Sequence, residues 1–418
     1  MAQTKPTAFA AQAFDRERWR RFADSMAVAL AVSLPWSTSA TGILAAVWLM
    51  AVIPILDGAL LRRILLTPAG GLPVLLCVLA TAGMAWASGL SMAERWEGLV
   101  SFLKLLAIPL LMAQFRRSGR GQWVACGFLV SCAVLLALSW LLTAVPGVPW
   151  PWRGKGPIGV PLKDYIAQSA ELIVCAAMLG GLAFRAWLER RRGVAVTWLA
   201  IIVLIAANIL MVATSRTALV VIPVLVLLFA YWHFSGRVMV AFVLAIVAAA
   251  ALAWTLAAPT RDNVMGMIHE VQTFDPTGDE TRAGARLEFW KKAIDFIVEA
   301  PLIGHGTGSI HDQYRRSAGG GGMAALASSN PHNQTLAVGI QLGLLGTAVM
   351  FAMWLAHAAL FWRTGFIAWV GLAIVAQNIV GSLFNSHLFD FFHGWGYVLG
   401  VGVAGGMVLR QTAAKPNA

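Results

Sequence analysis

Repeated apolar runs of about membrane length are the feature that most limits what this chain can fold into. Between residues 22 and 257, and again between residues 334 and 408, one run follows another with only short polar breaks. Crossing the hydrocarbon core of a bilayer takes about 20 residues of helix. The runs also lack the alternating polar positions of a transmembrane β-barrel. The sequence therefore predicts an all-α polytopic membrane protein.

Basic residues predict the number and the orientation of the spans. Arg and Lys in the short loops fall mainly on the side of the two tails, and positively charged loops face the cytoplasm. We therefore expect both termini inside, and we read the net charge of +12 as a result of topology and not as a sign of a nucleic-acid partner. About twelve transmembrane helices are predicted, at residues 22–35, 41–56, 72–88, 98–114, 124–145, 165–187, 195–213, 218–233, 238–257, 334–361, 366–383 and 395–408.

This scheme divides the chain into five parts. Residues 1–21 and 410–418 are predicted cytoplasmic tails, residues 22–258 hold nine spans, and residues 333–409 hold three. Residues 259–332 form one large outside loop. Within that loop, the stretch from 286 to 299 has helical period, and such an amphipathic helix is expected at the membrane surface. We expect an apolar face of Leu287, Trp290, Ile294 and Ile297, and a polar face of Lys291, Lys292, Asp295 and Glu299.

Two arginines on the outside are candidates for binding an anion. Arg216 lies in a short junction between two spans, on the side where topology needs no positive charge. Arg286 begins the amphipathic helix, and Arg282 shares its face if the helix begins early. Guanidinium groups bind phosphate oxygens through paired, charge-assisted hydrogen bonds. The plainer alternatives are snorkelling of Arg216 to the interface and a solvated ion pair between Arg286 and a neighbouring glutamate.

His332, where the chain re-enters the membrane, is a candidate general base. A neutral imidazole accepts protons near neutral pH, although a lone histidine at an interface also serves structural roles. The neighbouring Asn333 either orients the ring or caps the following helix. Lys155 and Asp390 are possible additional members of the site.

Other polar residues receive no role from the sequence. Lys104 and Glu171 lie inside apolar runs and are expected to face the interior of the helix bundle. The cysteines lie in apolar runs without the spacing of a zinc site. The sequence therefore predicts neither a metal centre nor a cofactor.

Three local patterns, taken in order, resemble the O-antigen ligase and polymerase superfamily of bacterial membrane glycosyltransferases. The resemblance covers roughly residues 192–400, and Thr217 departs from it, since a glycine is common at that place. The patterns are TSRT at 214–217, RLEFW at 286–290 followed by PLIGHG at 301–306, and HNQTL at 332–336 running into GIQLGLLG at 339–346.

The resemblance implies metal-independent, inverting transfer of a glycan from an undecaprenyl-diphosphate donor. It places the reaction at the periplasmic face of the inner membrane of a Gram-negative cell. Arg216 and Arg286 would hold the diphosphate, and His332 would activate the acceptor hydroxyl. In a ligase of lipopolysaccharide biosynthesis the acceptor is a sugar of lipid A–core. An O-antigen polymerase, a pilin-type oligosaccharyltransferase and a transporter of lipid-linked glycans are the alternatives, and the single large loop favours the ligase.

Overall fold

The computed structural model describes residues 15–145, 147–148, 150, 158–161, 164–275, 281–319 and 322–413. None of these residues is in a β-strand. The α-helices are α1 (Arg16–Ser33), α2 (Thr38–Val52), α3 (Gly58–Leu65), α4 (Pro68–Gly83), α5 (Met92–Leu103), α6 (Ala107–Arg117), α7 (Gly121–Ala144), α8 (Tyr165–Leu188), α9 (Arg192–Met211), α10 (Arg216–His233), α11 (Gly236–Leu256), α12 (Ala258–Gln272), α13 (Arg282–Glu299), α14 (Ile310–Ser317), α15 (Gln334–Phe361), α16 (Phe366–Gly381) and α17 (Phe391–Ala413). Short 3-10 helices lie at Ile53–Ile55 (η1), Lys104–Leu106 (η2) and Gly322–Ala325 (η3).

Nine helical stretches in this described part of the chain are long and apolar enough to cross a membrane. They are α2 with η1, α5 with η2 and α6, each helix from α7 to α11, α15 and α17. Helices α3 and α4 pass the test only as a pair bent by 84°, and α16 is apolar but shorter. The prediction of a polytopic helical membrane protein is confirmed. The count of twelve spans and the inward orientation of both termini stay predictions.

The helices pack around two apolar clusters that meet at α16. One cluster chiefly joins α1, α2, α4, α5, α6, α15 and α17, and the other joins α7, α8, α9 and α10. Small residues let α17 approach α6 closely: a Cβ at Gly402 would lie 2.5 Å from the Leu111 side chain. By contrast, no residue of α11 is fully buried, and its half-buried Phe242 packs on Phe229 of α10, so this helix lies at the edge of the bundle.

The segment between α13 and α14 inserts into the bundle beside a break in α15. At Gly343 the backbone has φ of +60°, which interrupts the helix. The freed groups pair with the inserted segment: the Gly306 N–H donates to the Gln341 carbonyl oxygen at 2.9 Å, and the Leu344 N–H donates to that of Pro301 at 2.8 Å. The Thr307 hydroxyl donates a hydrogen bond to the carbonyl oxygen of Ala80 on α4 at 2.6 Å. These bonds tie the segment between α13 and α14 to the long apolar helices.

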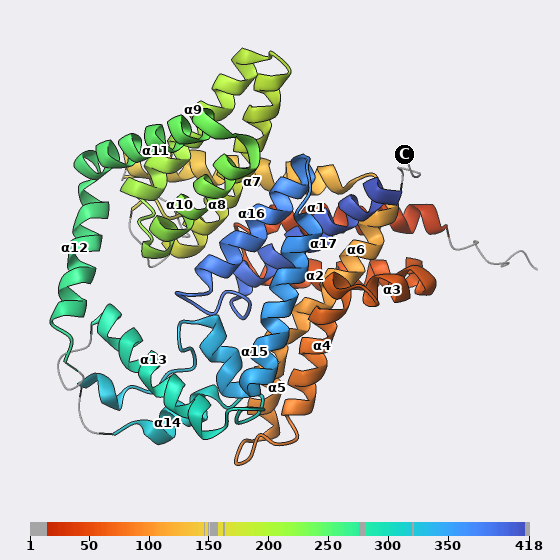
Figure 1. Ribbon diagram of the computed structural model, residues 1–418. Helices are drawn as coiled ribbons and strands as arrows, with labels where there is room; N and C mark the ends of the chain where they lie inside the picture. The colour runs from red at the N-terminus through yellow and green to blue at the C-terminus, as the bar shows by residue number, and fades with distance from the viewer. Residues whose placement is uncertain are drawn as a thin grey trace, which may run out of the picture.

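Helices α12, α13 and α14 lie at the edge of the helix bundle. In Figure 1, α12 runs along the left edge from α11 down to α13 and α14, which lie near the lower end of α15. A small apolar cluster holds them there, in which the buried Tyr314 ring contacts the rings of Phe289 and Phe296. The Tyr314 hydroxyl also donates to the Phe289 carbonyl oxygen at 2.7 Å. The position of α13 over the start of α15 is therefore fixed by packing.

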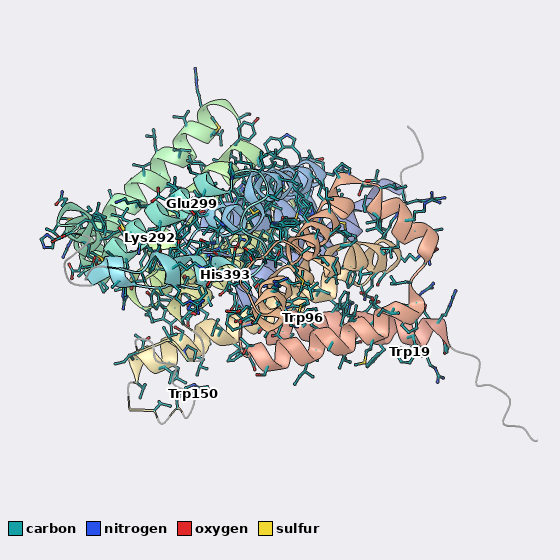
Figure 2. The ribbon with its side chains drawn as sticks, turned by 90° about the horizontal axis from the view of Figure 1, so that it is seen from below. Trp19, Trp96, Trp150, Lys292, Glu299 and His393 are labelled. Carbon is teal, nitrogen blue, oxygen red and sulfur yellow. The ribbon has the colours of Figure 1, made fainter. Side chains whose placement is uncertain are left out.

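The predicted faces of α13 are partly wrong. The buried stripe includes Lys292, which was assigned to the polar face, whereas Ile294, assigned to the apolar face, is 54 % exposed. Lys292 is satisfied because its Nζ donates to the Ala324 carbonyl oxygen at 2.6 Å and lies 3.9 Å from Glu288. Lys292 and Glu299, which are both labelled in Figure 2, thus lie on the same helix, but Lys292 is buried and Glu299 is exposed. The helix does begin at Arg282, so Arg282 and Arg286 are one turn apart.

Candidate active site

Arg216 is the first residue of α10, and α12 supplies both of its polar partners. Its Nε donates to Oδ1 of Asn263 at 2.8 Å, and its Nη2 lies 3.1 Å from Oε1 of Glu270. The two charged side chains are 22 % and 23 % exposed, so the ion pair is neither solvated nor fully buried. The guanidinium is therefore held in one orientation at the N-terminal end of α10.

Glu270 connects Arg216 to the start of α13. Its second carboxylate oxygen accepts a hydrogen bond from the Ala283 N–H at 2.7 Å. Burial raises the pKa of Glu270, but the bonds from Ala283 and Arg216 and the charge of Arg282 outweigh it and hold the pKa below its usual range. Glu270 is thus a carboxylate that fixes the distance between the two arginine-bearing helices.

Arg286 is a half-buried cation on α13 close to Arg216. Burial and the charge of Arg216 both lower the pKa of its guanidinium, and Tyr165 and Glu270 act in the opposite direction. Within the described residues, no hydrogen bond or ion pair engages this guanidinium. Arginine stays protonated in proteins, and Glu270 offsets only one of the two positive charges. The pair Arg216 and Arg286 therefore presents unbalanced positive charge. This charge favours an anionic ligand.

His332 lies against the same helix. Its ring stacks on Phe289, three residues after Arg286, with ring centroids 6.3 Å apart and planes inclined by 24°. Its backbone has φ of +54°, a conformation that is strained for a residue with a side chain. Asn330 holds the strained backbone, because its Oδ1 accepts from the His332 N–H at 2.8 Å. The histidine is thus positioned by its neighbours and not by regular secondary structure.

Hydrogen bonds also select the tautomer of His332. Asn330 Oδ1 accepts from a backbone N–H, so its Nδ2 is the atom that donates to Oδ1 of Asn385 at 2.9 Å. The same Asn385 oxygen lies 3.3 Å from His332 Nδ1. Because an amide oxygen accepts but does not donate, Nδ1 carries the proton and Nε2 keeps its lone pair. The available nitrogen of the ring is therefore a proton acceptor.

The electrostatics of His332 agree with that role. Burial lowers the pKa of the imidazole, the charge of Arg286 lowers it further, and the bond to Asn385 raises it in part. The ring is therefore neutral at neutral pH. The structure brings Arg216, Arg286 and His332 into one group, in which each is linked electrostatically to the next.

These three residues lie within the stretch that matches a known family. Residues 201–351 match the model of a protein family described as O-antigen ligase. This match supports membership of the chain in that family. No curated protein matches the chain.

The family name gives the activity in general terms. O-antigen ligase family members are glycosyltransferase-type enzymes that act on lipid-linked glycans at a membrane. The nine apolar helical stretches found in the described residues agree with a multi-pass membrane protein.

The other residues predicted for the site lie in different places. Asn333 caps α15, because its Oδ1 accepts from the N–H groups of Thr335 and Leu336. Arg282 is exposed, although its charge acts on Glu270 and Arg286. The carboxylate of Asp390 accepts from His393 Nδ1 at 2.7 Å and thus has a partner of its own. Lys155 lies outside the described residues.

Sequence reasoning missed the residues that hold the centre together. Glu270, Asn263 and Asn385 were not singled out, and Tyr165 was seen only as the start of a span. None of them belongs to a local motif, and Glu270 and Asn385 are separated from their partners by more than 50 residues. Among the described residues, no group of three or more His, Cys, Asp or Glu is placed to hold a metal ion.

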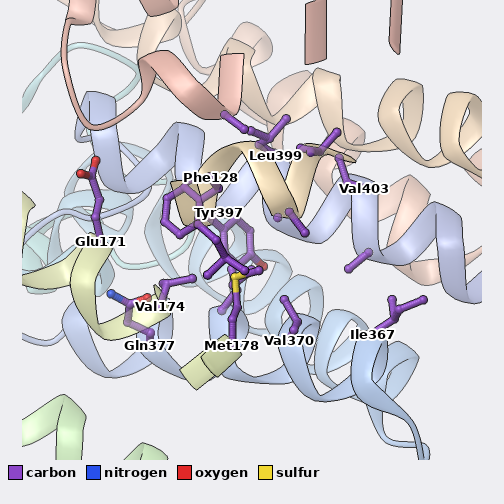
Figure 3. A pocket seen from close by; sticks show the side chains of 18 of the residues that line it. Phe128, Glu171, Val174, Met178, Ile367, Val370, Gln377, Tyr397, Leu399 and Val403 are labelled. Atoms are coloured by element: carbon purple, nitrogen blue, oxygen red, sulfur yellow. The ribbon is translucent and has the colours of Figure 1, made fainter. Parts of the chain in front are cut away.

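A membrane-embedded cavity of about 640 Å³ lies between α7, α8, α16 and α17. Its lining follows α8 from Ala167 to Arg185, about 27 Å at 1.5 Å per residue, which approaches the roughly 30 Å of a hydrocarbon core. Figure 3 shows Glu171 and Gln377 at one end, with apolar side chains such as Val370 further along. The cavity therefore has the length and the lining that suit a lipid chain.

Proposed function

We propose that the protein is an O-antigen ligase that transfers a glycan from an undecaprenyl-diphosphate donor to a sugar hydroxyl of lipid A–core. The single observation that carries the proposal is the grouping of Arg216, Arg286 and a neutral His332 whose Nε2 accepts protons. Transfer from a glycosyl diphosphate needs charge stabilisation at the leaving group and a base at the nucleophile. This group supplies both needs.

The donor's diphosphate binds to the two guanidinium groups. Arg286 has no partner among the described residues, and Arg216 is held ready by Glu270 and Asn263. Fixed positive charge lowers the energy of the transition state, in which negative charge builds up on the leaving oxygen. The arginines thus supply the charge that helps the diphosphate to leave.

His332 acts on the acceptor. Its Nε2 removes the proton from the acceptor hydroxyl while that oxygen forms a bond to the anomeric carbon. The bond between the anomeric carbon and the diphosphate oxygen breaks, and its electron pair leaves with the diphosphate. The attack comes from the side opposite the leaving group, so the configuration at the anomeric carbon inverts. The proton on His332 then passes to water.

The remaining parts of the proposal concern place and substrate. The cavity between α7, α8, α16 and α17 offers a site for the lipid chain of a substrate. The charge distribution supports a cytoplasmic location for both tails, which puts the group on the periplasmic side of the inner membrane. One dominant outside segment, residues 259–332, favours the ligase over the polymerase.

Transfer by the purified protein tests the proposal. The donor is an undecaprenyl-diphosphate glycan, lipid A–core and a second lipid-linked glycan are offered separately as acceptors, and EDTA is present throughout. Product on lipid A–core alone supports the ligase, and growth of the lipid-linked chain identifies a polymerase. Absence of product with either acceptor, from protein shown to be folded, contradicts both.

Variants test the assigned roles. His332→Ala is expected to abolish transfer, whereas His311→Ala, at an exposed histidine on α14, is expected to retain it. Arg216→Ala and Arg286→Ala are expected to weaken donor binding, with the exposed Lys291→Ala as the matched control on α13. Full transfer by His332→Ala would remove the general base from the mechanism.

A further inference from the structure

Lys104 is a half-buried cation outside the group that contains His332. It lies in η2, at the break between α5 and α6. Its Nζ donates to the backbone carbonyl oxygens of Phe389 at 2.9 Å and Asp390 at 2.8 Å. These two residues end the segment from 382 to 390, here called the outer loop, which joins α16 to α17. Lys104 therefore fixes one end of the outer loop.

The bundle is shaped to admit this lysine. A Cβ at Gly394 would lie 2.7 Å from Lys104 Nζ and 2.6 Å from the Leu388 carbonyl oxygen, so a side chain there would displace the ammonium group. The charge of Asp390 adds to the attraction. Ionisable groups inside a membrane protein are costly and are placed where they have partners. An apolar residue would fill the same space at lower cost but would leave the two carbonyl oxygens unbound.

The rest of the outer loop is bound to the segment that carries His332. The Gln334 N–H donates to the Ser382 carbonyl oxygen at 2.8 Å, and its side-chain oxygen accepts from the Leu388 N–H at 2.9 Å. The Ser386 hydroxyl donates to Oδ1 of Asn330 at 2.7 Å. Asn385 lies between these attachments and accepts from His332 Nδ1. The outer loop thus connects Lys104, which binds its residues 389 and 390, to the imidazole of His332, which bonds to its Asn385.

We propose that Lys104 is a positioning residue for His332. By holding residues 389 and 390, it fixes the outer loop so that Asn385 selects the tautomer and the plane of the imidazole. The inference rests on the proposed function, in which His332 is the general base. Among the described residues, the side chain of Lys104 bonds to Phe389 and Asp390 and not to the arginine pair. Its removal is therefore expected to change turnover and to leave the affinity for the donor unchanged.

Kinetics with Lys104→Met provide the first test. Because Lys104 acts through the bond from His332 to Asn385, its replacement is expected to lower kcat by no more than the loss of that one neutral hydrogen bond, about 2- to 13-fold, with an unchanged KM for the donor. Leu105→Met, a similar exchange at the next buried position, serves as the control. In an Asn385→Leu background, which already lacks the bond to His332, Lys104→Met is expected to cause no further loss. An equal fractional loss in both backgrounds would show a general structural role and overturn the proposal.

A spectroscopic test does not depend on transfer. In protein labelled with ¹⁵N-histidine, the His332 signals are identified by their loss in His332→Ala, and they should report a protonated Nδ1. Lys104→Met is expected to change that signal toward a mixture of tautomers, and Leu105→Met is not. An unchanged signal in Lys104→Met overturns the positioning role even if the wild type transfers glycan. If Lys104→Met changes the signal but the wild-type protein transfers no glycan, the positioning role is supported and only the proposed function is contradicted.

Discussion

Replacing Asn385 tests the assignment of His332 as the base more closely than replacing the histidine itself. Asn385→Leu keeps a side chain of similar size but removes the oxygen that lies 3.3 Å from His332 Nδ1. A neutral hydrogen bond contributes about 0.5–1.5 kcal/mol, which corresponds to about 2- to 13-fold in rate. We expect kcat for glycan transfer to fall within that range, with the donor's KM unchanged.

The pH dependence of kcat is expected to shift in a definite direction in variants of Asn385. The bond from His332 to Asn385 raises the pKa of the imidazole, against the lowering by burial and by Arg286. Without that bond the pKa falls further, so the acidic limb of kcat against pH moves to lower pH in Asn385→Leu. In Asn385→Asp the acceptor becomes a carboxylate, which favours imidazolium, so the limb moves to higher pH. Limbs that move in the same direction in both variants, or that do not move, would refute the reasoning.

The other predictions concern the anion site, the inserted segment and the cavity. Arg286→Gln is expected to weaken donor binding by about 10- to 150-fold, the equivalent of one charge-assisted hydrogen bond of about 1.5–3 kcal/mol, in a direct binding titration. Gly306→Ala is expected to destabilise the fold by about 2–5 kcal/mol, the sum of left-handed strain and overpacking, since φ is +93° and the new Cβ would lie 2.5 Å from the Ala87 Cα. Thermal unfolding in detergent measures this, with Gly266→Ala, where no atom lies within 4 Å, as the control. Val370→Trp, which fills part of the cavity, is expected to raise the KM for a long-chain lipid donor more than for a short-chain analogue.

The apolar runs were enough to predict the helical class and the place of every long apolar helix. Membrane spans can be read this way because each one satisfies its backbone within its own helix. The polar interval at residues 259–332 was predicted to lie outside the membrane, because a stretch of that composition is costly in lipid, and its side of the membrane stays a prediction. Arg216 and His332 stood out because each is a polar residue at the end of a span. The sequence signal for the candidate site therefore came from the contrast with lipid.

The parts that could not be predicted depend on contacts between distant segments. Glu270 reads as one more charge on a polar helix, and only the fold brings it to Arg216. Asn385 lies 53 residues beyond His332, with a whole span between them. The faces of α13 were misread because amphipathic period assumes that charges face solvent. Lys292 instead finds backbone oxygens of the segment that follows α14.

In the proposed mechanism, the charges at the candidate site also couple the binding of the donor to the strength of the base. Glu270 offsets Arg216, while Arg286 has no ion-pair partner among the described residues and its charge lowers the pKa of His332. A diphosphate that binds to Arg286 cancels much of that field, because the two groups carry opposite charges and lie close together. The proton affinity of His332 then rises at the moment when an acceptor hydroxyl must be deprotonated. Arg286 thus keeps His332 neutral before the donor binds and lets its proton affinity rise afterwards. This coupling needs the two groups close together: Arg286 lies on α13, and His332, in the segment that precedes α15, packs on Phe289 three residues further along α13.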